Sequence, residues 1–189
     1  MVFRCAKTIK NAVVNGVKSI FSLVSDEISP YAYNEDLKQT KIFVYRAFPS
    51  KSPIYPSIVI MSSTGNVPIT TYFQDHVSEG TTTDTIGGSF DITITVTVIA
   101  ESTVDKENVM NILLKGLVYI SRSVFDTDGM VLQNPIGLGG ETQDTYGGAK
   151  MYHSQSLNLR FYSEWEEDAG PYALLSKVDI YNSFSLSEE

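Results

Sequence analysis

The chain has 189 residues, of which 42% are hydrophobic and 19% are charged, and its formal net charge at pH 7 is −8. This length favours one domain over residues 1–189, because domains commonly hold roughly 100–200 residues. An acidic chain is not expected to wrap duplex DNA, because neutralising phosphates requires clustered Lys and Arg. The charge suits instead a surface along which DNA passes without binding.

The cysteine count argues against a disulfide-stabilised or cysteine–zinc protein, and the hydropathy argues against a membrane-spanning one. Cys5 is the only cysteine, which excludes a disulfide framework and a cysteine-based zinc site. No apolar run approaches the roughly 20 residues that a membrane-spanning helix needs, so we expect no membrane association. Arg4 and Lys7 precede a short apolar stretch, but polar residues interrupt it too often for a signal peptide. We therefore expect no targeting segment.

Residues 4–28 place apolar side chains at helical spacing, which predicts an amphipathic helix that ends at Pro30. A helix with one apolar face usually covers a sheet. Binding to a membrane surface is the alternative, but the Trp or dense basic face that favours it is missing.

Short strands are predicted next, at 41–48, 57–61 and 68–75, because these runs are rich in β-branched and aromatic residues. Three prolines stand between the first two runs, which indicates a sheet edge or a turn there. The polar segments 62–66 and 76–85 are predicted to be a turn and a loop.

Residues 88–100 form the clearest element, because their side chains alternate strictly between two faces. One face is apolar and consists of Phe90, Ile92, Ile94, Val96, Val98 and Ala100. The other is mostly polar and consists of Asp91, Thr93, Thr95, Thr97 and Ile99. Such alternation is typical of a half-buried strand, with the polar face left for water, a channel or a partner.

An amphipathic helix follows directly and extends to residue 125. Ser102 or Thr103 can cap it, and Asp105 lies in its first turn, where the helix dipole favours negative charge. Gly116 lies mid-helix at a cost of about 1 kcal/mol relative to alanine. We expect this glycine to let the helix approach the sheet closely.

The last third of the chain begins with a glycine-rich segment. Residues 126–150 contain six glycines and are predicted to be a long loop or flexible hairpin, with a short strand at 130–132. Residues 151–165 alternate again and are predicted to pair with strand 88–100. The tail, residues 170–189, is expected to dock on its own domain or on a neighbour because of its apolar side chains Ile180, Phe184 and Leu186.

Together these elements predict an α+β fold. We expect a mainly antiparallel or mixed β-sheet with two amphipathic helices packed on one face, a long β-hairpin or loop, and an extended C-terminal tail.

No cluster of residues predicts an active site. The run 137–140 is rich in glycine but lacks the Lys and Ser or Thr of a phosphate-binding loop. His76 and His153 lack metal-ligand spacing and are expected to be a loop and a sheet residue. The acidic run 164–168 lacks the spacing of a calcium-binding loop and is expected to face solvent. We predict no catalytic residue, no cofactor and no metal.

The order of these elements resembles that of the tail terminator, or tail completion, proteins of tailed bacteriophages. The resemblance is carried by the N-terminal helix ending near 26–28, the strand at 55–60, and the strand 88–100 that leads into helix 105–125. The glycine-rich hairpin and the strand at 157–165 complete it.

The resemblance implies a structural, non-enzymatic protein of the virion that forms a homohexameric ring. Such a ring caps the tail tube, stops its polymerisation and joins the tail to the neck, while DNA passes through the lumen without sequence-specific binding. The implied partners are further copies of the chain, the tail tube protein, the neck or connector protein and, in contractile tails, the sheath. Assembly would take place in the host cytoplasm.

The resemblance also implies two sets of contact residues. We expect a lumen or intersubunit face at Asp91, Thr93, Thr95 and Thr97. We expect ring-to-ring or subunit contacts at Gly137, Gly139, Gly140, Tyr146 and Phe184. The extra length at 127–149 and 170–189 leaves another neck or head–tail connector component as an alternative. A small monomeric ligand-binding module is the alternative from a different class, and a hydrolase lacks the residue clusters of a catalytic site.

Overall fold

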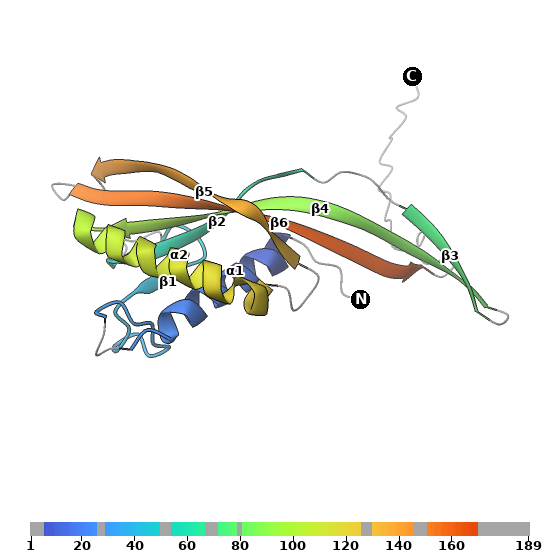
Figure 1. The fold of residues 1–189 in the computed structure, drawn as a ribbon, viewed down its shortest axis with the longest axis horizontal. Helices are drawn as coiled ribbons and strands as arrows, with labels where there is room; N and C mark the ends of the chain where they lie inside the picture. The colour runs from blue at the N-terminus through green and yellow to red at the C-terminus, as the bar shows by residue number, and fades with distance from the viewer. Residues whose placement is uncertain are drawn as a thin grey trace, which may run out of the picture. The chain divides into compact units, whose positions relative to one another are not determined.

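The computed structural model describes residues 6–25, 29–49, 54–66, 72–78, 81–125, 130–145 and 151–169. Within these residues the fold is α+β, with two helices and a mixed sheet of six strands (Figure 1). The helices are α1 (Ala6–Ser22) and α2 (Thr103–Phe125). The strands are β1 (Phe43–Tyr45), β2 (Ser57–Asn66), β3 (Tyr72–Ser78), β4 (Thr81–Ala100), β5 (Met130–Thr145) and β6 (Met151–Ala169).

The strands are ordered β1-β2-β4-β6-β5, and β3 pairs with β4 off this path. β1 and β2 are parallel, whereas β2 with β4, β3 with β4, and β5 with β6 are antiparallel. The predicted pairing between the strand at 88–100 and the strand at 151–165 is confirmed, because β4 and β6 are neighbours in the sheet.

The chain divides into two compact units. The smaller unit comprises Met1–Phe3, Ile69–Gly88 and Trp165–Glu189, and β3 pairs there with the first part of β4, from Ser78↔Thr81 to Tyr72↔Gly87. The larger unit comprises Arg4–Pro68 and Ser89–Glu164 and contains both helices. The candidate site described below lies entirely in the larger unit.

One face of the sheet in the larger unit, here called the inner face, packs against the helices. α1 contacts α2, β1 and β2, while α2 also contacts β5, and both helices lie on the same side of these strands (Figure 1). The inner face buries the apolar residues of the alternating pattern, namely Ile92, Ile94, Val96 and Val98 of β4 and Leu157, Leu159 and Phe161 of β6. Phe161 meets Phe125 of α2 edge to face, with 5.3 Å between the ring centroids.

Gly116 does allow a close approach, but its neighbour is α1 and not the sheet as expected. A Cβ atom placed on Gly116 would lie 2.3 Å from Cγ2 of Ile20. Real Cβ atoms do not come this close to another carbon, so the two helices can pack at this separation only because residue 116 has no side chain. The sequence indicated that α2 approaches another element closely at Gly116, but it could not indicate which one, because the distance between α1 and α2 is set by the folded structure.

Two predicted loops are strands. The polar segment 76–85 was expected to be a loop, but β3 extends to Ser78 and β4 begins at Thr81. For the glycine-rich segment 126–150, the loop alternative is wrong, because β5 occupies Met130–Thr145, whereas the antiparallel pairing of β5 with β6 agrees with the hairpin alternative and with the short strand expected at 130–132. In β5 the glycines and a proline fall at register shifts between Gln133 and Gly137 and between Leu138 and Glu141, so bulges accommodate them.

Other boundaries differ by a few residues. α1 ends at Ser22, before the expected stop at Pro30, and the first strand is limited to β1. The predicted turn at 62–66 is the end of β2, which pairs with β4 across an irregularity between Ser62 and Gly65. The ends of helices and strands depend on packing and on strand pairing with residues that are distant in the sequence, so local propensity alone does not fix them.

Candidate functional site: the outer face of the sheet

The face of the sheet opposite the helices, here called the outer face, carries all four residues predicted for a lumen or intersubunit surface. Asp91, Thr93 and Thr95 are half-buried, whereas Thr97 is only 8% exposed. The prediction that these residues share one face is confirmed by their alternation with the buried residues of β4. Whether this face meets a lumen or another subunit stays a prediction.

Side chains on the outer face bond to one another across the strands. Thr95 Oγ1 donates to Asn158 Oδ1 at 3.0 Å, and Thr97 Oγ1 lies 2.9 Å from Ser156 Oγ. The residue numbers rise along β4 as they fall along β6, as in an antiparallel pair. These bonds tie the hydroxyl groups to the neighbouring strand and leave this part of the face polar but without a net charge.

Asp91 links three strands on the same face. Its carboxylate accepts a charge-assisted hydrogen bond from Arg160 Nη2 of β6 at 2.6 Å, and Gln133 Nε2 of β5 lies 3.5 Å from its other oxygen. The Arg160 side chain is 59% exposed and the Asp91 side chain 27% exposed. The pair therefore cancels the charge of Arg160 at the surface while costing little desolvation.

Beyond Thr97 the outer face turns apolar, which was not predicted from the sequence. Val59, Ile99 and Tyr152 are buried there, and the ring of Tyr152 stacks on the ring of Tyr55 with 4.2 Å between centroids. Partly buried Tyr45, Tyr55 and Met61 pack around them. Two residues in the sequence mark this apolar end. Ile99 is the apolar member of the otherwise polar outer face of β4, and Tyr152 is the aromatic first residue of the otherwise polar outer face of β6.

A cavity of about 260 Å³ opens over this apolar end. Its wall includes Ile99 and Tyr152, and its rim includes Thr142, Gln143 and Asp144 of β5. Thr142 Oγ1 lies 2.6 Å from Ser154 Oγ, which ties β5 to β6 beside the cavity.

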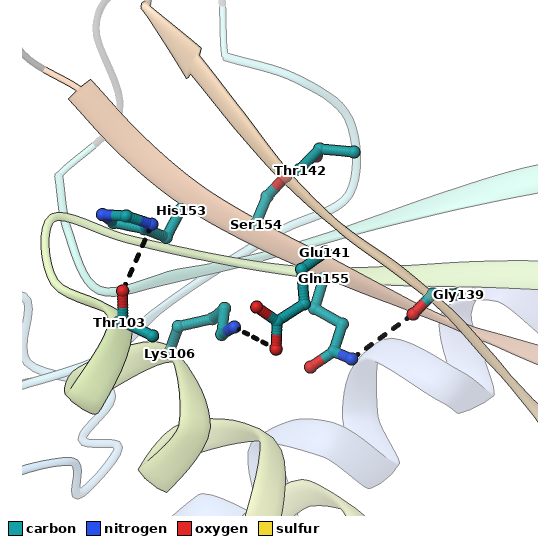
Figure 2. Close-up of polar contacts among 8 residues, drawn as sticks. All are labelled: Thr103, Lys106, Gly139, Glu141, Thr142, His153, Ser154 and Gln155. Carbon is teal, nitrogen blue, oxygen red and sulfur yellow. Dashed lines mark hydrogen bonds and ion pairs between the residues drawn. The ribbon is translucent and has the colours of Figure 1, made fainter.

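On the inner face, a polar cluster joins the first turn of α2 to the β5–β6 pair (Figure 2). Lys106 is fully buried, and its Nζ lies 2.6 Å from Oε1 of Glu141, whose side chain is 57% exposed. Gln155 Nε2 donates to the carbonyl oxygen of Gly139 at 3.3 Å. A buried ammonium needs a partner, so this ion pair fixes where β5 lies relative to α2.

Two more groups belong to this cluster. His153 Nδ1 lies 3.3 Å from Thr103 Oγ1, in agreement with the expectation that His153 is a sheet residue (Figure 2). Ser102 is the cap of α2, because the backbone N–H of Asp105 donates to Ser102 Oγ at 3.1 Å and Ser102 Oγ donates to Asp105 Oδ2 at 2.8 Å.

Tyr31 meets the other oxygen of the same carboxylate. Its hydroxyl donates to Asp105 Oδ1 at 2.5 Å. Burial raises the pKa of Tyr31, and the hydrogen bond to Asp105 raises it further, because both favour the neutral phenol. The phenol therefore serves as a donor that anchors the segment before β1 to the start of α2.

The three glycines predicted for subunit contacts differ in surroundings. A Cβ atom on Gly139 would lie 3.1 Å from the backbone oxygen of Ser156, and one on Gly137 would lie 3.4 Å from Cβ of Asn158. Close packing on β6 therefore accounts for Gly139. A Cβ atom on Gly140 would meet nothing within 4 Å. Tyr146 and Phe184, the remaining predicted contacts, lie outside the described residues.

Some other expectations also fall on residues that the structure does not describe, including the C-terminal tail and the side chains of 164–168. Among the described residues, no group of three or more His, Cys, Asp or Glu side chains is placed to hold a metal ion. In that same part of the chain, neither helix combines the length and the apolar character needed to cross a bilayer.

The chain matches no protein-family model, and no curated protein matches it.

Proposed function

We propose that this chain is a structural, non-enzymatic protein of a tailed-phage virion, a tail terminator whose copies form a ring. In this proposal the ring caps the tail tube, stops its growth and joins the tail to the neck, and DNA passes through the ring. The proposal rests on the resemblance in element order and on one structural observation, which is the division of the sheet into two unlike faces.

That division supports a role in assembly. The inner face is used to bury the helices, whereas the outer face presents an organised polar surface and, at one end, an apolar cavity. In the described part of the chain, both helices pack on the inner face, and a sheet face without a helix on it is the kind of surface that lines a bore or meets another subunit.

The electrostatics of the outer face agree with passage of DNA. Its polar part consists mainly of hydroxyl and amide groups, and the guanidinium of Arg160 is paired with Asp91. A surface of this kind in a chain with a net charge of −8 offers few cations to phosphates, so it would not retain DNA.

The mass of the protein in solution tests the proposal. We would measure it by native mass spectrometry and light scattering, alone and with the tail tube protein encoded by the same genome, and image both samples by negative stain. We expect a hexameric ring, alone or upon addition of tube protein, and we expect the ring to shorten tubes that polymerise in its presence.

A stable monomer that neither binds tube protein nor limits tube length would contradict the proposal. A ring that forms but leaves tube growth unchanged would instead favour another neck or connector component.

A further inference from the structure

The outer-face cavity has a size and lining that suit one side chain of a protein partner. Its volume of about 260 Å³ is below the roughly 300–1,000 Å³ of pockets that bind drug-sized ligands. Its apolar wall includes Ile99 and Tyr152, which are 3% and 9% exposed, together with Phe48 at 40%. The hydroxyl of Thr142 and the carboxylate of Asp144 give the rim hydrogen-bonding groups and a negative charge.

A matching projection lies on α2. Tyr119 is 84% exposed, the highest value among the exposed large hydrophobic residues, and its neighbour Val118 is 68% exposed. Lys115 precedes Tyr119 by four residues, so both side chains lie on one face of the helix, and Lys115 is also exposed. The surface therefore combines an aromatic group, an aliphatic group and a positive charge.

These two surfaces are complementary in polarity and charge. An aromatic ring with a polar tip can fill an apolar cavity while its hydroxyl reaches the polar rim, and tyrosine is among the residues that dominate binding at interfaces. The ammonium of Lys115 would then lie on the side of the acidic rim at Asp144, which gives the contact an orientation.

The fold prevents a copy from making this contact with itself. The cavity opens on the outer face of the sheet, whereas α2 packs on the inner face. If α2 fills the cavity, it must therefore come from a second copy, and the contact joins two different surfaces. Such a heterologous contact leaves one cavity and one projection free on every pair, so further copies add to it, and a ring forms where the rotation between neighbours closes.

We propose that Tyr119 and Lys115 of one copy bind the cavity formed by Phe48, Ile99 and Tyr152 of the next copy. The inference names the subunit contact of the ring and therefore rests on the proposed function. It is tested with the purified chain alone, so that its failure can be told apart from a failure to cap tubes.

Disulfide trapping in the full-length chain tests the contact. Two single-cysteine variants, Val118→Cys and Thr142→Cys, would each be made with Cys5→Ser, and one would carry a mass tag. Thr142 is exposed and alternates with Glu141, so its side chain lies on the outer face beside the cavity. Mixed in equal amounts under mild oxidation, they should form the mixed disulfide at least about tenfold faster than either homodimer, because the contact joins unlike surfaces. Leu37→Cys, at a residue that is 73% exposed elsewhere in the larger unit, replaces Val118→Cys as the matched control.

A charge reversal makes the test specific. Adding Lys115→Glu to the Val118→Cys chain should slow the mixed disulfide by about tenfold, because it places two like charges together. Adding Asp144→Lys to the Thr142→Cys chain should restore the rate. The inference is overturned if the mixed disulfide forms no faster than the Leu37→Cys control, if the homodimers dominate, or if the second reversal fails to restore the first.

Discussion

The two faces of the sheet consist of alternate residues of the same strands, yet they differ in what their side chains contact. In β6, Phe161 is fully buried against α2, whereas the side chain of its neighbour Arg160 is 59% exposed and contacts Asp91. The inner face determines stability, since it contains most of the buried apolar area. Under the proposed function the outer face contacts partners, so changes there should affect assembly more than folding.

The largest expected change in the free energy of unfolding is at Phe161, and its neighbour Arg160 on the outer face is the matched comparison. Phe161→Ala removes a buried ring and leaves a cavity against Phe125, so we expect the free energy of unfolding to fall by about 4 kcal/mol. Arg160→Ala should lower it by less than about 1 kcal/mol, because its ion pair is exposed. Urea unfolding followed by circular dichroism measures both. Equal losses would mean that the two faces do not differ in this way.

The second effect concerns the ion pair on the inner face. Glu141→Gln leaves the ammonium of Lys106 buried without a counter-charge, so we expect a loss of about 2 kcal/mol, less than for a fully buried pair because Glu141 is half exposed.

The control for that variant replaces both partners. Lys106→Met with Glu141→Gln removes the buried charge together with its partner, and its unfolding free energy should return to within about 1 kcal/mol of the wild type. If the double variant were less stable than Glu141→Gln alone, Lys106 would be held by its stem and not by its charge.

A smaller effect is expected at the helix–helix contact. Gly116→Ala adds a methyl group against Ile20, which should cost about 1–3 kcal/mol, and the better helix propensity of alanine returns about 1 kcal/mol of this. A net loss near 1 kcal/mol should appear in thermal unfolding. Combined with Ile20→Ala, the new methyl group has room, so the double variant should lose less than the sum of the single changes.

Local periodicity was enough to predict the central part of the fold. The strict alternation of 88–100 predicted both the strand and its buried face, and the alternation of 151–165 predicted its neighbour in the sheet. The Ser102 cap and the apolar stripe likewise marked the start and the buried face of α2. Each of these signals resides in residues that are close together in the sequence.

The full length of strand β5, the buried ion pair and the cavity could not be predicted, because each depends on contacts between segments that are distant in the sequence. The glycines and the proline of β5 indicate a loop when considered alone, but pairing with β6 and two register shifts make this segment a strand. The ion pair between Lys106 and Glu141 links positions 35 residues apart and has no local signature. The cavity likewise needs side chains from the segment after β1 and from three strands, so only the folded chain brings its lining together.

The smallest expected effect on stability is at Gly140. A substitution there should therefore change assembly without changing the free energy of unfolding. A side chain at this position meets nothing within 4 Å in its own chain, so Gly140→Gln should change the unfolding free energy by less than about 0.5 kcal/mol. If Gly140 lies at a subunit contact as predicted, the longer side chain must be accommodated by the neighbour, and the fraction of protein in rings should fall at a fixed concentration. Gly139→Ala provides the opposite control, because its Cβ would press on the backbone of β6 and lower the melting temperature. If the Gly140→Gln variant forms rings as readily as the wild type, residue 140 does not lie at the subunit contact. The conclusions about the inner face would not change.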